Sequence, residues 1–181
     1  MNFKTIVLLP FLILYSNLIL SQDSLLKYEK VIILDSSYNK SDLFINARQF
    51  ITDNFIDANQ VLTINDKIEG EIGGNGNMRY YPKGIMGSSG FYNIIFKIKI
   101  EVRDGKYKYS FYNFTPITIP EGLFGVITYD ELYPYKPHDK LLKGWYNRSW
   151  KEMKIQIETN ILKLIDTLND SMKSKSKKEE W

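Results

Sequence analysis

The chain has 181 residues, of which 44% are apolar and 14% aromatic, and its 24 basic and 21 acidic residues leave a net charge of +3. It has no cysteine and one histidine, which excludes a disulfide framework, a thiol nucleophile, a cysteine zinc site, a lipoprotein anchor and a multi-histidine metal centre. The apolar content is too high for a disordered chain, and the length fits one folded domain.

The first 21 residues have the layout of a secretory signal peptide. Lys4 precedes an apolar run over residues 6–20, and small or polar residues follow it. The run has 15 residues, whereas a membrane-spanning helix needs about 20. We therefore expect export to the periplasm or the exterior, with cleavage after Ser21 and a single domain over residues 22–170. If the segment is not cleaved, it tethers the domain to the membrane.

The small excess of positive charge lies outside this domain. Lys4 leaves with the signal peptide, and residues 171–181, interpreted as a lysine-rich flexible tail, carry four lysines and two glutamates. Residues 22–170 are therefore neutral, with 19 basic and 19 acidic residues. Binding to nucleic acid through counterion release needs clustered basic residues, so no nucleic-acid partner is expected.

The first two elements of the domain are a strand and a helix. Residues 27–35 (KYEKVIILD) are a β-branched apolar run, which predicts a buried strand in the middle of a sheet. Residues 41–55 place apolar side chains at spacings of three and four, behind Asn39 or Ser41 as a possible N-cap. This pattern predicts an amphipathic helix with an aromatic-rich face.

Residues 60–64 and 67–72 predict two strands of a hairpin that turns at Asn65–Asp66. The glycines that follow, Gly73, Gly74 and Gly76, lack the pattern of a phosphate-binding loop and are interpreted as a bulge or tight bend. Residues 87–90 (GSSG) resemble a hydrolase nucleophile elbow only in their letters and are interpreted as a turn.

The clearest pattern is the period-two alternation over residues 94–103, which predicts a strand with one buried and one exposed face. The apolar set is Ile94, Phe96, Ile98, Ile100 and Val102, and it alternates with Ile95, Lys97, Lys99, Glu101 and Arg103. Asp104–Gly105 is a favoured two-residue hairpin turn. The expected pairs across this turn are Val102 with Tyr107, Ile100 with Tyr109, Ile98 with Phe111 and, on the exposed face, Glu101 with Lys108.

After Phe114, four prolines and many aromatics indicate a long irregular connection over residues 115–148. The last element is an amphipathic helix of about six turns, predicted to begin at Ser149 because its spacing from Glu152 is that of a capping box. This order of elements predicts an α+β fold, in which an antiparallel sheet of four to five strands has two helices packed on one face.

The stretches YEKVIILD, KSDLFINARQFI, KIEGEIGGNG and IFKIKIEVRDGKYKYSFYNF, followed by the long helix, resemble the bacterial domain-of-unknown-function family DUF4468. The similarity extends from Tyr28 to about Met172, and Lys108 stands where arginine is common in the family. Members are typically exported and are described as having a TBP-like fold. The resemblance implies the order strand, helix, four strands, helix, and it implies no activity or binding residues.

The aromatic residues of the connection are the strongest indication of a binding site. Long ordered connections are often functional, and tyrosine and tryptophan combine a large contact area with a polar group. The alternative is that these rings only cover the edge of the core. The candidate ligand- or partner-binding residues are Tyr129, Tyr133, Tyr135, Trp145 and Tyr146.

The exposed face of the predicted hairpin offers a second surface. It carries five basic side chains with an acidic and an aromatic one beside them, which are Lys97, Lys99, Arg103, Lys106, Lys108, Glu101 and Tyr112. Because the domain is neutral overall, this face is interpreted as a solubilising surface rather than a nucleic-acid site.

No catalytic, cofactor-binding or metal-binding residues are predicted. His138 lies in a proline-rich loop without a nucleophile motif, and the adjacent Asp130 and Glu131 point apart on an extended segment. The sequence favours a non-enzymatic exported domain of the bacterial envelope that binds an envelope protein or glycan through the sheet face or the aromatic connection. The alternative is a hydrolase of envelope glycans or peptides, in which folding brings together carboxylates such as Asp130, Glu131 and Asp139.

Overall fold

The computed structural model describes residues 25–55, 62–82, 92–117, 124–136 and 139–174. The elements in chain order are β1 (Lys27–Ile33), α1 (Lys40–Asn54), β2 (Leu62–Asp66), β3 (Glu71–Tyr80), β4 (Tyr92–Arg103), β5 (Lys106–Ile117), the short 3-10 helix η1 (Lys140–Leu142) and α3 (Lys143–Lys173). The predicted signal peptide, the GSSG turn, His138 and the chain after Ser174 lie outside the described residues.

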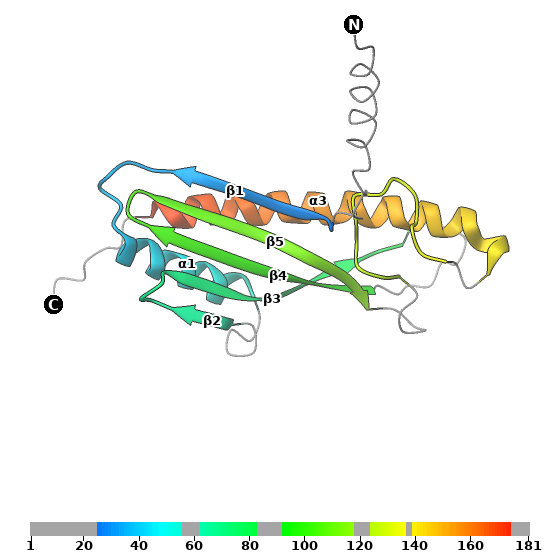
Figure 1. The fold of residues 1–181 in the computed structure, drawn as a ribbon, viewed down its shortest axis with the longest axis horizontal. Helices are drawn as coiled ribbons and strands as arrows, with labels where there is room; N and C mark the ends of the chain where they lie inside the picture. The colour runs from blue at the N-terminus through cyan, green and yellow to red at the C-terminus, as the bar shows by residue number, and fades with distance from the viewer. Residues whose placement is uncertain (1–24, 56–61, 83–91, 118–123, 137–138, 175–181) are drawn as a thin grey trace, which may run out of the picture.

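The five strands form one antiparallel sheet in the order β1-β5-β4-β3-β2, and α1 and α3 lie on the same side of it (Figure 1). The predicted α+β architecture is therefore confirmed, with five strands. We call the face under the helices the inner face and the opposite face the outer face. No helix in the described part of the chain combines the length and the apolar character needed to cross a membrane.

The β4–β5 hairpin follows the register expected from its alternation. Val102 lies opposite Tyr107, and Gly105 in the turn has a φ of +68°, a conformation that glycine adopts readily. The buried residues of β4 on the inner face are Ile94, Phe96, Ile98, Ile100 and Val102. Glu101 and Lys108 are opposite each other as predicted, but the Lys108 Nζ lies 3.0 Å from Glu29 Oε2 on the neighbouring strand β1.

Helix α1 is also as predicted. Asn39 is its N-cap, and the Asn39 Oδ1 accepts a hydrogen bond of 2.9 Å from the Asp42 backbone N–H. Within α1, the side-chain amide of the buried residue Asn46 donates hydrogen bonds to the backbone carbonyls of Met172, at 3.4 Å, and Ser174, at 2.8 Å. These bonds join α1 to the last turn of α3 and satisfy carbonyls that a helix end leaves without partners.

The prediction of a buried central strand over residues 27–35 is wrong in its placement. β1 is the edge strand of the sheet, next to β5, and the outer-facing Val31 and Ile33 are 52% and 81% exposed. An apolar run without alternation does not tell how many of its faces are covered. Here the helices cover one face only.

The glycine-rich segment forms the middle of a strand. Gly73, Gly74 and Gly76 all belong to β3, and the hairpin turns after Asp66 rather than at Asn65–Asp66. The expected irregularity is a register shift in β2, between Leu62 and Ile64, opposite Gly74 and Gly73. At Gly76 the Phe96 ring on β4 lies so close that an added Cβ would be 2.2 Å from its Cζ. The glycine thus makes room for a core aromatic ring.

The long helix starts earlier than the capping-box pattern indicates. α3 begins at Lys143, directly after η1, and Ser149 is a buried residue within the helix. Asp139 caps η1, because its Oδ1 accepts a hydrogen bond of 2.8 Å from the Leu141 N–H. β5 continues to Ile117, so the connection between β5 and the helices is shorter than the predicted 115–148. α3 also includes 171–173 of the predicted tail.

We predict that Gly76→Ala lowers the free energy of unfolding by about 1–3 kcal/mol, because the new methyl group would overlap a buried aromatic ring. Gly144→Ala is the matched control, since nothing lies within 4 Å of the added Cβ in this exposed helical residue. The control is expected to raise stability by up to about 1 kcal/mol. Urea denaturation measures both, and similar small effects would contradict the close contact with Phe96.

Glu29 provides a second test. Hydrogen bonds from Lys27, Ser110 and Lys108 lower the pKa of its carboxyl from 4.5 to about 2. A carboxyl whose pKa is lowered by folding contributes stability above pH 4.5 that disappears as the pH falls towards 2. We expect Glu29→Gln to lower the melting temperature at pH 7, and the difference from the unmodified protein to vanish between pH 4.5 and 2. Thermal melts of the exposed-residue control Glu69→Gln should show no such convergence.

Candidate functional site

The aromatic connection packs against the first half of α3 through a cluster of rings. Phe124 lies at its centre, with ring centroids 5.5–5.7 Å from those of Tyr133, Trp145 and Tyr146. Tyr133 and Tyr146 are stacked at 4.8 Å, and Tyr133 meets Trp150 edge to face at 5.7 Å. This cluster covers the end of the core and holds the connection in one place.

Polar contacts fix the same segment to α3. The Trp150 Nε1–H donates a hydrogen bond of 3.0 Å to the Asp130 carbonyl, which also accepts one from the Lys154 ammonium. The Asp130 Oδ2 accepts a bond of 2.6 Å from the Thr128 hydroxyl. The Tyr135 hydroxyl donates to the Val126 carbonyl at 2.6 Å. Residues 124–136 are therefore held in a fixed position against α3, and we call them the wall segment.

Tyr129 connects the wall segment to the sheet. Its hydroxyl donates a 2.6 Å hydrogen bond to the Lys27 carbonyl and accepts a 3.3 Å bond from the Lys27 N–H. The Leu26 N–H donates to the Ile127 carbonyl at 2.9 Å, just before β1 begins. The Tyr129 ring is 54% exposed, so one side of it stays open to a ligand.

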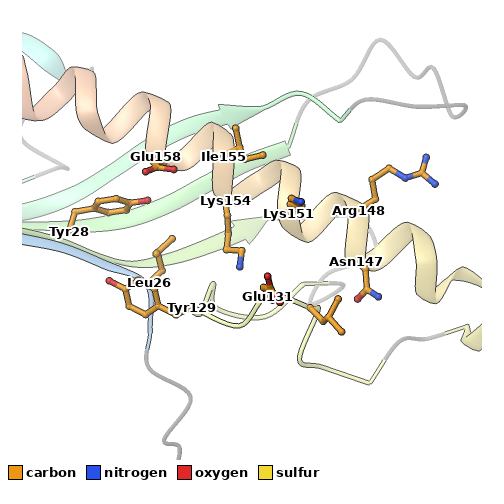
Figure 2. Close-up of a pocket in the computed structure, with 11 residues that line it drawn as sticks. Leu26, Tyr28, Tyr129, Glu131, Asn147, Arg148, Lys151, Lys154, Ile155 and Glu158 are labelled. Atoms are coloured by element: carbon orange, nitrogen blue, oxygen red, sulfur yellow. The ribbon is translucent and has the colours of Figure 1, made fainter.

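A cavity of about 700 Å³, which we call the α3 cavity, lies between the start of β1, the connection and α3 (Figure 2). The start of β1 and the connection contribute Leu26, Tyr28, Tyr129, Glu131 and Leu132. α3 contributes Asn147, Arg148, Lys151, Lys154, Ile155 and Glu158. Such a volume is in the range of small-ligand pockets, and the lining combines apolar and aromatic walls with a few charged groups.

The charges of the α3 cavity are arranged by the helix. Arg148, Lys151 and Lys154 follow one another at steps of three, which places them along one side of α3. Burial lowers the pKa of the Lys154 ammonium, against the opposing effect of Asp130 and Glu131. The three cations exceed the two carboxylates of the lining, Glu131 and Glu158.

The opposite wall adds a partly buried phenol. Burial, together with the charge of Glu158, raises the pKa of Tyr28 to about 12. The Tyr28 hydroxyl therefore keeps its proton at any physiological pH and can act as a hydrogen-bond donor. Amine, guanidinium and phenol groups together suit an acidic group of a ligand, and the rings suit an apolar or sugar-ring surface beside it.

The structure separates the predicted aromatic residues into two groups. Tyr129 lines the α3 cavity, whereas Tyr146 is 2% exposed within the ring cluster. Tyr133 and Trp145 are half-buried in the same cluster, and Tyr135 lies over Gly125 with its ring 6.0 Å from that of Trp150.

Sequence reasoning missed Tyr28 and the cations of α3. The three-residue steps from Arg148 to Lys154 could have indicated a basic stripe, but on a long amphipathic helix such a stripe is also the ordinary solvent-facing side. Tyr28 lies in an apolar run whose orientation was not evident.

The carboxylates considered for catalysis have separate positions. Those of Asp130 and Asp139 each accept a hydrogen bond from a nearby residue, Thr128 and Leu141 respectively. Glu131 is exposed and lines the α3 cavity. Within the described residues, no group of three or more histidine, aspartate or glutamate side chains could hold a metal ion.

The family model described as a domain of unknown function (DUF4468) with TBP-like fold matches residues 28–116. The chain carries a DUF4468 domain. The resemblance inferred from the sequence is thus confirmed over residues 28–116. The match begins in β1 and ends in β5, so the connection and α3, which form most of the α3 cavity, follow the matched part of the DUF4468 domain.

Two solved structures are similar to this chain. A DUF4468 family protein from Bacteroides ovatus superposes with a TM-score of 0.61 at 9% identity, over 86% of this chain and 90% of that one. A TBP-like protein from Parabacteroides distasonis gives a TM-score of 0.47 at 12% identity, over 79% and 92% respectively. The first similarity shows a shared fold. No curated protein matches the chain.

The different burial of two predicted site residues leads to a stability prediction. Tyr146→Ala removes a buried ring from the cluster and should lower the free energy of unfolding by about 3–5 kcal/mol. Tyr129→Ala removes a largely exposed ring and its hydrogen bonds to Lys27, and should cost about 1 kcal/mol. Urea denaturation distinguishes them, and an equal loss for Tyr129 would assign it to the core rather than to the cavity surface.

Proposed function

We propose that this protein is a non-enzymatic binding domain of the bacterial envelope, and that the α3 cavity holds an acidic group of an envelope glycan or peptide. The observation that supports this proposal is the lining of the cavity, in which Arg148, Lys151 and Lys154 of α3 are found together with Tyr28 and Tyr129; Figure 2 shows the Lys154 side chain pointing towards Tyr129. The expected export signal over residues 1–21 supports a location in the envelope.

The walls of the cavity are fixed by contacts within the protein, and this supports a role in binding. Its walls are held by the backbone hydrogen bond from Leu26, just before β1, to Ile127 in the connection, and by the Trp150 bond to the Asp130 carbonyl. A site that is already formed loses little conformational entropy when a ligand enters. Lys151 and Arg148 are exposed residues of the lining, and their charges can attract an anion towards the cavity.

The roles of the acidic residues favour binding over hydrolysis. A hydrolase that uses two carboxylates needs both aimed at one bond, one as acid and one as base or nucleophile. The Asp130 side chain instead bonds Thr128 in its own segment, and Asp139 caps η1. Glu131 faces lysines across the cavity, an arrangement that suits the orientation of a ligand with a positive group of its own.

The proposal is tested with Lys151→Gln, which removes one exposed cation from the cavity. We expect binding of an oligogalacturonate or an oligoglutamate, measured by calorimetry, to weaken about tenfold, since a charge-assisted hydrogen bond contributes about 1.5–3 kcal/mol. Lys163→Gln, an exposed lysine on the same helix that does not line the cavity, should bind as the unmodified protein does. Equal binding of neutral counterparts, or equal losses in both variants, would refute an acidic-ligand site here.

A further inference from the structure

We propose that the outer face of the sheet contains a second binding site, for a phosphate-type group, at the turn end of the β4–β5 hairpin. A hollow of about 200 Å³ opens there, lined by Val31, Glu101, Arg103, Lys106, Tyr107 and Lys108. We call it the hairpin hollow. It lies on the face opposite the helices, shares no lining residue with the α3 cavity and does not depend on the function proposed for that cavity.

Two like charges are directly opposed at this site. Arg103 and Lys106 are the last cross-strand pair before the turn, so their side chains leave the same face of the sheet at neighbouring positions. Neither has an acidic partner within 4.0 Å among the described residues. Like charges in this position repel each other and weaken the hairpin, and a bound anion between them removes the repulsion.

The acidic residues of the outer face are already used by other lysines. Glu29 pairs with Lys27 and, at 3.0 Å, with Lys108. Lys99 lies between two carboxylates, 2.9 Å from Glu71 Oε1 and 3.5 Å from Glu101 Oε1. Glu101 therefore lines the hollow as a group that is already paired. The unbalanced positive charge at this end of the face belongs to Arg103 and Lys106.

The turn that carries these two cations is held firmly. The Asp104 Oδ1 accepts a 2.7 Å hydrogen bond from the Lys40 N–H at the start of α1. The Gly105 N–H donates to the Tyr38 carbonyl at 2.8 Å, and the Gly105 carbonyl accepts from the Leu34 N–H at 2.7 Å. The backbone positions of the opposed pair are therefore set before any ligand arrives, which lowers the entropic cost of binding.

The types of side chain point to a phosphate-type ligand. Arginine presents a planar fork that matches two oxygens of a phosphate, and lysine adds a compact charge at the third. The exposed apolar side chain of Val31 borders the hollow, and Ile33 lies opposite Lys106 on β1. This neighbourhood suits a phosphate joined to a carbon chain or ring better than a strongly hydrated free ion. A phospholipid headgroup and a soluble phosphate ester share this chemistry, and experiment can separate them.

The first experiment measures thermal melting with increasing inorganic phosphate, at an ionic strength kept constant with chloride. We expect a saturable rise in the melting temperature of the unmodified protein, because a ligand that binds only the folded state stabilises it. In the double variant Arg103→Gln/Lys106→Gln the apparent affinity should fall by about tenfold or more. Lys97→Gln, on the same face of β4 but outside the hollow, is the matched control and should keep the full response.

A second measurement needs no ligand. At low salt, Lys106→Glu replaces a repelling pair with an attracting one and should raise the melting temperature, and added salt should reduce this gain. Circular dichroism establishes that each variant is folded. A phosphate response that is unchanged in the double variant, or a Lys106→Glu variant that melts below the unmodified protein at low salt, would overturn the proposal.

The source of the phosphate is distinguished by sedimentation with vesicles. Vesicles of phosphatidic acid in phosphatidylcholine are compared with phosphatidylcholine alone, and glycerol 3-phosphate serves as the soluble ester. Co-sedimentation that depends on Arg103 and Lys106 supports a lipid headgroup, and binding of the soluble ester without co-sedimentation supports a soluble ligand. Failure of both overturns the hairpin hollow as a phosphate site. The double variant Arg103→Gln/Lys106→Gln changes no residue of the α3 cavity, and Lys163→Gln, which lies in neither site, should leave these results unchanged, so the two proposed sites can fail independently.

Discussion

The burial of a single sheet face under two helices is the constraint on which the rest of this structure depends. The alternating residues of β4 place Ile98, Ile100 and Val102 under α1 and α3, and this leaves every second residue of the strand on the other side. Those outer residues are mainly charged, and pairs such as Lys99 with Glu71 compensate much of that charge. The burial of one face of the sheet therefore produces both the core and an exposed, charged outer face.

The two halves of α3 pack against different parts of the structure. Its second half lies on the sheet, whereas Figure 1 shows its first turns extending beyond the ends of β4 and β5, where the aromatic connection covers them. The apolar side of this part receives Trp150 and Tyr146, and its polar side becomes a wall of the α3 cavity. A helix longer than the sheet thus creates a second, smaller packing layer with a cavity at its border.

The elements that the sequence predicted correctly are those whose structure depends on interactions between residues close together in the chain. The β4–β5 hairpin and α1 were evident because alternation, an Asp–Gly turn and the Asn39 cap act between near neighbours. The edge position of β1 was not predicted, because it depends on pairing with β5, which is far from β1 in the sequence. The start of α3 depends on ring contacts of Tyr146 that outweigh the capping signal at Ser149. At the site, Tyr129 was within the predicted group, but the cations of α3 and Tyr28 line the same cavity only through the tertiary fold.

The bonds from Asn46 to the end of α3 span 126 and 128 positions of sequence. The cover of the inner sheet face is therefore completed by a segment that follows all five strands in the chain. Until α3 has emerged, the apolar side of the nascent sheet has only α1 to shield it, and a chain that stops before Trp150 leaves that side open to water. The inner face can therefore be fully covered only after all five strands have been made, and a chain that lacks α3 exposes apolar surface of the kind that promotes aggregation.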